Sequence, residues 1–168
     1  MIIRQATIKD AHAVQDVLIT SQWFTYESLY SKEYIQQLID QYYNFHRIAD
    51  EIQFMNTSWH GYYVAEMPGK IVGVIGGGMI GETAGEVYVF YMNPTVRGMG
   101  IGTRLLNFFT KIQKHTYGAT EQWVAVAKGN NYAIPFYKAR GFIFQCEEPT
   151  YGSSETDLDI ALKFKRKI

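Results

Sequence analysis

Between Glu86 and Leu106, a strand, a glycine-rich turn and the start of a helix follow one another without a gap. Residues 87–92 are β-branched, aromatic or apolar and predict a buried strand, which ends at Asn93-Pro94. Three alternating glycines then precede the helix: Gly98, Gly100 and Gly102. The first N–H groups of a helix have no internal partner, and the helix dipole favours negative charge there. This order therefore predicts a site for a phosphate-bearing cofactor.

The spacing of the glycines narrows the class of cofactor. A dinucleotide-binding turn has the pattern G-x-G-x-x-G, with an acidic residue about 20 positions later. Here the glycines run G-x-G-x-G, and no acidic residue ends a following strand. The chain also lacks the Gly-Lys-Ser/Thr of a P-loop. The spacing therefore argues against both of these phosphate-binding classes.

Two motifs resemble those of a known family. Arg97-x-x-Gly100-x-Gly102 resembles the [Q/R]-x-x-G-x-[G/A] pyrophosphate loop of the GNAT acetyltransferase superfamily, although this segment alone would also suit a structural turn. Residues 130–142, NNYAIPFYKARGF, are similar to the later signature of the family, N-x-x-A-x-x-F-Y-x-x-x-G-F. The resemblance covers residues 1–164 and is specific over residues 86–142. It implies an α/β fold with acetyl-CoA as co-substrate.

The resemblance also implies which residues bind acetyl-CoA. The N–H groups of residues 98–103 would surround the pyrophosphate, and Thr103 would add its hydroxyl. Asn130 would contact the pantetheine arm, although its capping of the next helix would also explain this asparagine. The predicted binding set is Tyr91, Met92, Asn93, Arg97, Gly98, Met99, Gly100, Ile101, Gly102, Thr103, Asn130 and Tyr137.

Acetyl transfer to an amine requires a neutral amine, a donor to the developing oxyanion and a proton for the departing thiolate. By resemblance, the Tyr137 hydroxyl would supply the proton and the backbone N–H of Met92 would bind the oxyanion. Glu86 matches the general-base glutamate of histone-acetylating members. The alternative is that Glu86 is only a solvated glutamate at a strand end, and that a chain of water molecules accepts the proton of the amine. Glu66 and Glu121 have less positional support.

Composition limits the partners and the location. The 168 residues include sixteen basic and sixteen acidic side chains, and 47% are hydrophobic. We therefore expect one domain over residues 1–168, with no nucleic-acid or membrane partner. We expect neither a signal segment nor a membrane span, and the single cysteine excludes an internal disulfide, so the expected location is cytoplasmic. The four histidines share no ligand spacing, and we expect no metal.

Hydrophobic periodicity predicts one mixed α/β sheet of about six to seven strands with helices on both faces. We expect strands over residues 2–6, 62–66, 70–75, 86–92, 122–127 and 157–164, and a further strand that starts at residue 143. We expect helices over residues 11–20, 45–55 and 101–117, and a further helix that starts after residue 31. Residues 23–26 are expected to break the first helix, and the third segment to continue the second helix or form its own. Pro135 is expected to bend the helix that carries Tyr137. The last basic residues, Lys163, Lys165, Arg166 and Lys167, are expected to form a solvated tail.

The favoured function is transfer of an acetyl group from acetyl-CoA to a primary amine by direct attack, without a covalent enzyme intermediate. The C-terminal segment, from FYKARGF onwards, is similar to that of bacterial PaiA-type polyamine acetyltransferases. Its acidic residues, with Glu27, would attract a polycation: Glu147, Glu148, Glu155 and Asp157. The alternatives are acetylation of a protein amino terminus or lysine, and a non-catalytic acyl-CoA sensor. The surplus of aromatic residues over 23–63 would suit an acceptor pocket, the core or a homodimer surface.

Overall fold

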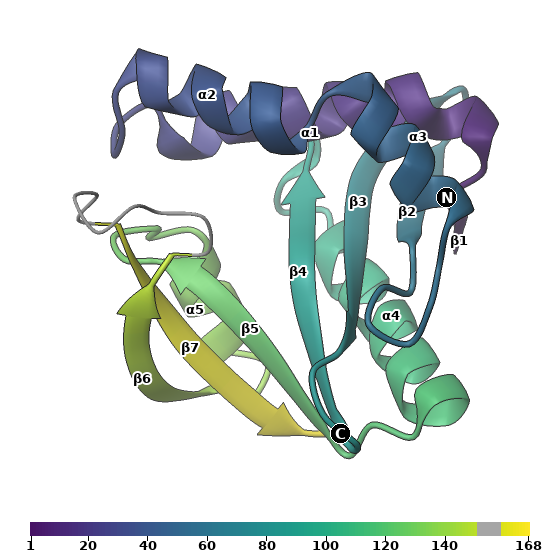
Figure 1. Cartoon of the computed structure of the whole chain (residues 1–168), viewed down its shortest axis with the longest axis vertical. Helices are drawn as coiled ribbons and strands as arrows, with labels where there is room; N and C mark the ends of the chain where they lie inside the picture. The colour runs from purple at the N-terminus through teal and green to yellow at the C-terminus, as the bar shows by residue number, and fades with distance from the viewer. Residues whose placement is uncertain (151–158) are drawn as a thin grey trace.

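The computed structural model describes residues 1–150 and 159–168, and within them seven strands form one sheet in the order β1-β2-β3-β4-β5-β7-β6 (Figure 1). The strands are β1 (Ile2–Gln5), β2 (Tyr62–Met67), β3 (Lys70–Met79), β4 (Ala84–Met92), β5 (Glu121–Ala127), β6 (Ile143–Pro149) and β7 (Ile160–Lys167). The helices are α1 (Ala11–Tyr26), α2 (Lys32–Tyr42), α3 (Phe45–Gln53), α4 (Ile101–Tyr117) and α5 (Ala133–Lys138), with short 3-10 turns at Ile8–Asp10 and Pro94–Val96.

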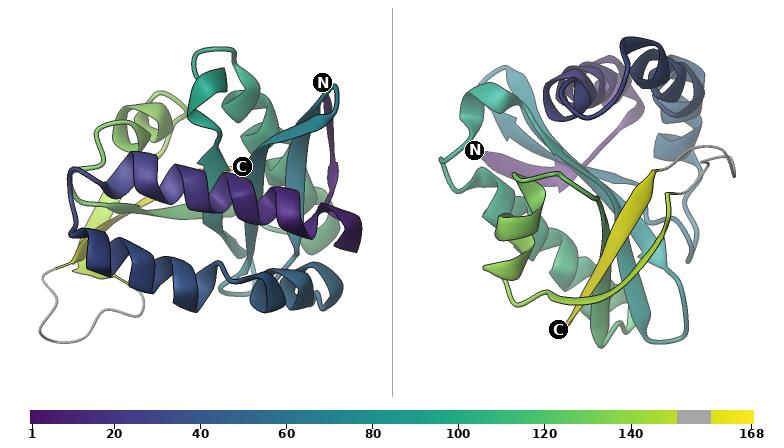
Figure 2. Two further views of the ribbon diagram at one scale, coloured as in Figure 1. Left: turned by 90° about the horizontal axis from the view of Figure 1, so that it is seen from above. Right: turned by 90° about the vertical axis from the view of Figure 1, so that its left-hand side faces the viewer.

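Two apolar cores lie on opposite faces of the sheet, because successive side chains of a strand point to opposite faces. On one face, Leu105 and Phe109 of α4 pack with the strands and with α5. On the other face, Val14 of α1 and Ile48 of α3 pack against Val64 of β2. Figure 2 shows α1 and α2 side by side, with α4 on the opposite side of the sheet. The predicted mixed sheet with helices on both faces is confirmed.

The neighbours β4 and β5 are parallel and are connected through α4, as the strand–helix–strand order predicts. They pair over four residues only, from Ala84 opposite Glu121 to Val87 opposite Val124. In contrast, β5 pairs with β7 along its whole length, Glu121–Ala127. Beyond Val87, β4 and β5 therefore diverge, and Figure 1 shows the two strands opening away from each other.

The first helix is longer than its sequence pattern predicts. We expected residues 23–26 to break it, but α1 continues to Tyr26. The buried face continues past Leu18 through polar residues, because Ser21, Gln22 and Thr25 are buried in the same helical phase. A search for apolar residues alone misses this continuation. The segment after α2 forms a separate helix, since the Asn44 side chain accepts a hydrogen bond from the Arg47 N–H and caps α3.

The basic C-terminal residues are not a solvated tail, because they belong to β7. Lys163 Nζ lies 2.6 Å from a carboxylate oxygen of Glu86, which is 77 residues away in the sequence. Arg166 donates to the side-chain oxygen of Gln122 at 2.9 Å and to the carbonyl of Arg140 at 2.9 Å. These partners lie far away along the chain, so no local pattern could reveal them. Residues 157 and 158, the first two of the predicted closing strand, lie outside the described residues.

Candidate active site

The divergence of β4 and β5 coincides with a cavity of about 460 Å³. Its walls come from the end of β4, the turn that follows, the first turn of α4, the α5 region and the buried face of α1. Ten residues of the predicted set line it: Tyr91, Met92, Arg97, Gly98, Gly100, Ile101, Gly102, Thr103, Asn130 and Tyr137. Three predicted residues, Asn93, Met99 and Glu86, do not line it.

The turn after β4 is fixed by an asparagine and two glycines. The Asn93 side-chain oxygen accepts hydrogen bonds from the N–H of Thr95 at 3.0 Å and from its hydroxyl at 2.7 Å. Gly98 and Gly100 have φ values of +78° and +74°, in the left-handed region that favours glycine. Asn93 therefore shapes the turn from outside the cavity.

The first helical turn of α4 presents backbone N–H groups. The first hydrogen bond of the helix runs from the Arg104 N–H to the Gly100 carbonyl at 3.2 Å, so the N–H groups of residues 101–103 precede it and have no helical partner. A Cβ atom on Gly102 would lie 3.6 Å from the rings of Phe90 and Phe136, which is ordinary contact. Packing within the protein therefore does not require glycine at this position.

Two arginines border the cavity. The Arg97 guanidinium packs against two rings that also contact each other, with its carbon 4.4 Å from the centre of Phe24 and 4.2 Å from the centre of Tyr132. The Arg140 Nε donates to the Thr103 hydroxyl at 3.1 Å. The Thr103 hydroxyl thus already has a partner within the protein. The sequence analysis did not single out Arg140, although it lies inside the second motif.

Asn130 caps the segment that leads into α5, as expected from the sequence. The Asn130 side-chain oxygen accepts from the N–H groups of Tyr132 and Ala133, at 3.2 and 3.1 Å, and the helix begins at Ala133. The Ile134 N–H donates to the Asn130 carbonyl at 3.2 Å, so the proline ring takes the place of the next N–H donor. The bend at Pro135 stays a prediction, and Tyr137 lies on the cavity wall.

Tyr137 is almost completely enclosed, with 7% of its surface exposed. Its ring lies 6.3 Å from that of Phe90 and 5.2 Å from that of Phe142. Burial raises the pKa of the Tyr137 phenol well above its ordinary value, and the nearby Tyr91 phenol raises it further. At neutral pH this hydroxyl is protonated and can donate a proton.

The backbone N–H of Met92 points toward the side of β4 from which β5 diverges. The Asn93 N–H donates to the Val72 carbonyl of β3 at 2.8 Å. Because successive N–H groups of an antiparallel strand point to opposite sides, the Met92 N–H points away from β3, toward the side that β5 has left. The Met92 carbonyl accepts a hydrogen bond from the Ser21 hydroxyl of α1 at 3.0 Å.

Glu86 lies near the start of β4, where β4 and β5 are still paired. Its carboxylate is 2.6 Å from Lys163 Nζ, and the two side chains are 11% and 12% exposed. Glu86 is thus neither solvated, as one sequence interpretation proposed, nor part of the cavity wall. Its role as a general base stays a prediction.

Sequence reasoning missed two hydroxyl-bearing residues of α1 that line the cavity, Ser21 and Thr25. They are one helical turn apart and in phase with the apolar residues Val14 and Leu18. Polar side chains that continue an apolar helical face were the signal that could have identified them.

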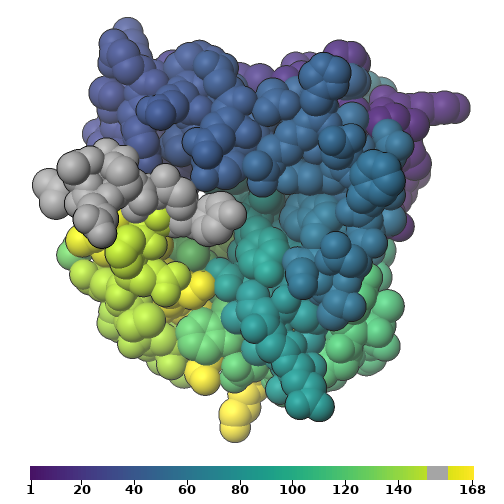
Figure 3. Space-filling model, in the orientation of Figure 1, coloured from purple at the N-terminus to yellow at the C-terminus, as the bar shows by residue number. Residues whose placement is uncertain are grey.

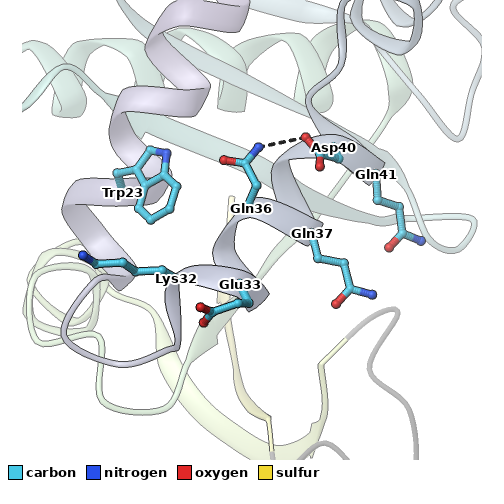
Figure 4. A pocket seen from close by; sticks show the side chains of 7 residues that line it. All are labelled: Trp23, Lys32, Glu33, Gln36, Gln37, Asp40 and Gln41. Carbon is cyan, nitrogen blue, oxygen red and sulfur yellow. Dashed lines mark hydrogen bonds between the residues drawn. The ribbon is translucent and has the colours of Figure 1, made fainter.

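A second hollow, of about 820 Å³, lies on the outer side of the helices. Trp23 of α1 and six side chains of α2 line it, and the Gln36 amide donates to Asp40 at 2.8 Å (Figure 4). In the space-filling view, α2 and α3 form one continuous band above the strands (Figure 3). This hollow contains none of the predicted site residues, and we do not assign the chemistry to it.

Among residues 1–150 and 159–168, no three His, Cys, Asp or Glu side chains are grouped so that they could hold a metal ion. None of the helices in the same residues is both long enough and apolar enough to cross a bilayer.

Comparison with known proteins gives a consistent result. The model of the "Acetyltransferase (GNAT) family" matches residues 21–142. A spermidine N(1)-acetyltransferase of Thermoplasma acidophilum is 28% identical over 141 residues, which cover 83% of this chain and 86% of that protein. An N-acetyltransferase of Methanocaldococcus jannaschii is 26% identical over 132 residues, and the match spans 67% of this chain but only 58% of that relative. The crystal structure of the PaiA N-acetyltransferase from Thermoplasma acidophilum in complex with coenzyme A has a TM-score of 0.82, 28% identity and 98% coverage of both chains.

The ion pair of Glu86 and Lys163 generates a stability prediction. Lys163→Met should lower the free energy of unfolding by about 3–5 kcal/mol, because it leaves a buried carboxylate without its cation. Glu86→Gln combined with Lys163→Met should recover most of this loss, since no unpaired charge remains. Urea unfolding of the two single variants and the double variant measures the coupling. Strictly additive losses would show that the two side chains do not depend on each other.

Proposed function

The chain belongs to the GNAT family of acetyltransferases, and we propose that it transfers the acetyl group of acetyl-CoA to a primary amine of a polyamine such as spermidine or spermine. The main support for this reaction is that one cavity is lined both by the helix N–H groups that have no helical partner and by the buried phenol of Tyr137. The match to a spermidine N(1)-acetyltransferase over 83% of the chain supports the acceptor class.

The residues present fit acetyl-CoA. The diphosphate would lie against the N–H groups of residues 98–103, because the dipole of α4 favours an anion there. The cavity walls continue from this turn to Met92 and Tyr137, which would border the pantetheine arm and the thioester. Asn130, buried and already ordering the start of α5, would border the same arm.

Acetyl-CoA would supply an acyl group that is activated as a thioester. The protein would bind this group and stabilise the charges that develop during its transfer. The Met92 N–H would stabilise the negative charge that develops on the thioester oxygen. Tyr137 would give its proton to the departing thiolate, and burial keeps the phenol protonated until the thiolate forms. The amine nitrogen forms the new bond to the acyl carbon and loses one proton.

The amine proton needs an acceptor, and Glu86 is the side chain that the family pattern suggests. Since it lies outside the cavity wall and pairs with Lys163, it would receive the proton through water. The double variant described above tests this role. Retained acetyl transfer in that variant would show that the ion pair is structural and that another group, or water alone, accepts the proton.

Acidic residues near β6 support a cationic acceptor only in part. Glu147 pairs with Lys128 at 3.0 Å, and Glu148 lies 3.6 Å from Lys163, so both already have cationic neighbours. Two other residues that we expected to attract a polycation, Glu155 and Asp157, lie outside the described residues. The support for a polyamine therefore comes chiefly from the relatives.

The central experiment mixes the protein with acetyl-CoA and separate amine acceptors and follows the release of free thiol. We expect turnover with spermidine and spermine. Turnover only with peptides that carry a free amino terminus or a lysine would replace the polyamine by a protein acceptor. Binding of acetyl-CoA without turnover of any amine would identify a sensor instead.

Tyr137→Phe should lower kcat by about 10²–10⁴-fold, because it removes the proton donor and leaves the ring in place. The Michaelis constant for acetyl-CoA should change little. Because the pKa of the phenol is raised, the ratio of the two kcat values should stay constant from weakly acidic to weakly basic pH. Steady-state kinetics at several pH values measure this ratio, and an unchanged kcat would remove Tyr137 from the mechanism.

Gly102→Ala should raise the Michaelis constant for acetyl-CoA on the order of tenfold, because the new methyl group would keep the diphosphate away from the helix N–H groups. The folded protein has room for this methyl group at 3.6 Å from its nearest neighbours, so the melting temperature should not change. Titration of coenzyme A followed by calorimetry measures the same loss without turnover. Equal affinity in both proteins would place the diphosphate elsewhere.

A further inference from the structure

The last residue of β4 has two backbone groups that the sheet does not use. The Asn93 N–H donates to the Val72 carbonyl of β3 at 2.8 Å, so the N–H and the carbonyl of Met92 both point away from β3. Among the residues that the structure describes, the pairing of β4 with β5 ends at Val87. Both groups of Met92 therefore lie on the cavity side of the strand without a strand partner.

Helix α1 bonds to one of these two groups. The Ser21 hydroxyl donates to the Met92 carbonyl at 3.0 Å, across 71 positions of the chain. Ser21 is only 2% exposed, so this hydrogen bond is shielded from competing water. The bond occupies the carbonyl of Met92 and leaves the N–H of the same residue free to bind a ligand.

The peptide unit that follows Met92 is held at both edges. Its carbonyl is bonded to Ser21 of α1, and its N–H, which belongs to Asn93, is bonded to β3. Because a peptide unit is planar, it cannot rotate without losing one of these two bonds. Rotation at Met92 is thereby restricted, and so is the direction of the Met92 N–H. The hydroxyls of Tyr26 and Tyr91, 3.1 Å apart, tie α1 to the preceding residue of β4 as well.

The hydroxyl at position 21 interrupts the apolar face of α1. Val14 and Leu18 are buried in the same helical phase as Ser21. A buried hydroxyl costs free energy unless it is hydrogen-bonded. A serine within a helix also commonly bonds to the carbonyl one turn earlier, whereas Ser21 reaches across to β4. The bond to β4, rather than packing, therefore accounts for a serine at this position.

We propose that Ser21 is a positioning residue that fixes the peptide after Met92 and so keeps the Met92 N–H directed at the thioester oxygen of acetyl-CoA. The inference rests on the proposed function, in which this N–H stabilises the negative charge that develops on that oxygen. A donor that is already in place needs no rearrangement when the charge develops. In this role Ser21 acts through the peptide and makes no bond to the reacting atoms.

The first test compares Ser21→Ala with Ser21→Cys, using acetyl-CoA and spermidine. Alanine removes the hydroxyl and leaves a small gap, whereas cysteine fills the volume with a weak donor. Each should lower kcat about tenfold, less than the roughly 10²–10³-fold lost when an oxyanion donor is removed outright. Calorimetric affinity for coenzyme A should not change, because free coenzyme A has no thioester oxygen. Thr20→Ala is the matched control, since it removes an exposed hydroxyl from the same helix.

The second test observes the thioester directly and needs no turnover. Acetyl-CoA labelled at the carbonyl carbon is bound to each protein, and the carbonyl stretch is measured by isotope-edited infrared spectroscopy. A hydrogen bond to the oxygen weakens the C=O bond, so the wild-type band should lie at lower wavenumber than the band in solution. Both Ser21 variants should show a smaller shift. A serine that only stabilises the fold would not move this band.

The outcomes separate the role of Ser21 from the reaction itself. An unchanged kcat and an unchanged infrared band in both variants would overturn this role and leave the acetyltransferase intact. A wild-type rate in Ser21→Cys beside a slow Ser21→Ala would overturn it too, because volume rather than the hydrogen bond would then matter. Turnover of no amine would overturn the proposed function, and the infrared band would still decide the role of Ser21. The cysteine variant carries both tests if the alanine variant does not fold.

Discussion

The short parallel pairing of β4 and β5 is the constraint on which the site depends. Four residue pairs hold the two strands together, and beyond Val87 each strand follows its other neighbour. A parallel pair that continued to Met92 would use the backbone groups that now face the cavity and would close the space between Met92 and Tyr137. The fold thus obtains a cavity by ending a sheet contact early, while the antiparallel neighbours on both sides keep the strands in place.

The last two residues of β4 pack on opposite faces of the sheet at this opening. Tyr91 packs with the core formed by α1 and α3, whereas Met92 packs with the core formed by α4 and α5, because adjacent side chains point to opposite faces. Two neighbouring residues of one strand therefore pack with different cores and line the same cavity. The Ser21 hydroxyl, bonded to the Met92 carbonyl, ties α1 to the same peptide.

Local patterns predicted the parts of the site that follow one another in the chain. The glycine turn, the start of α4 and the segment that carries Tyr137 were all recognisable, because each depends on residues within a few positions of one another. Relations between distant segments were not. Lys163 of β7 pairs with Glu86 of β4 across 77 positions of the chain, and neither segment carries a sequence signature of this pairing. The length of α1 was missed for a different reason, since its buried face continues through polar side chains.

The packing of Arg97 against Phe24 and Tyr132 has a kinetic consequence. The stacked guanidinium links α1 to the segment before α5 while it borders the cavity. The two ring contacts, each worth roughly 0.5–1 kcal/mol at an exposed site, hold the arginine in place before a ligand arrives. Its N–H donors lie in the plane of the guanidinium and are not used by these contacts. An anion that binds them would therefore have less side-chain freedom to restrict, and its encounter would need no rearrangement of this side chain.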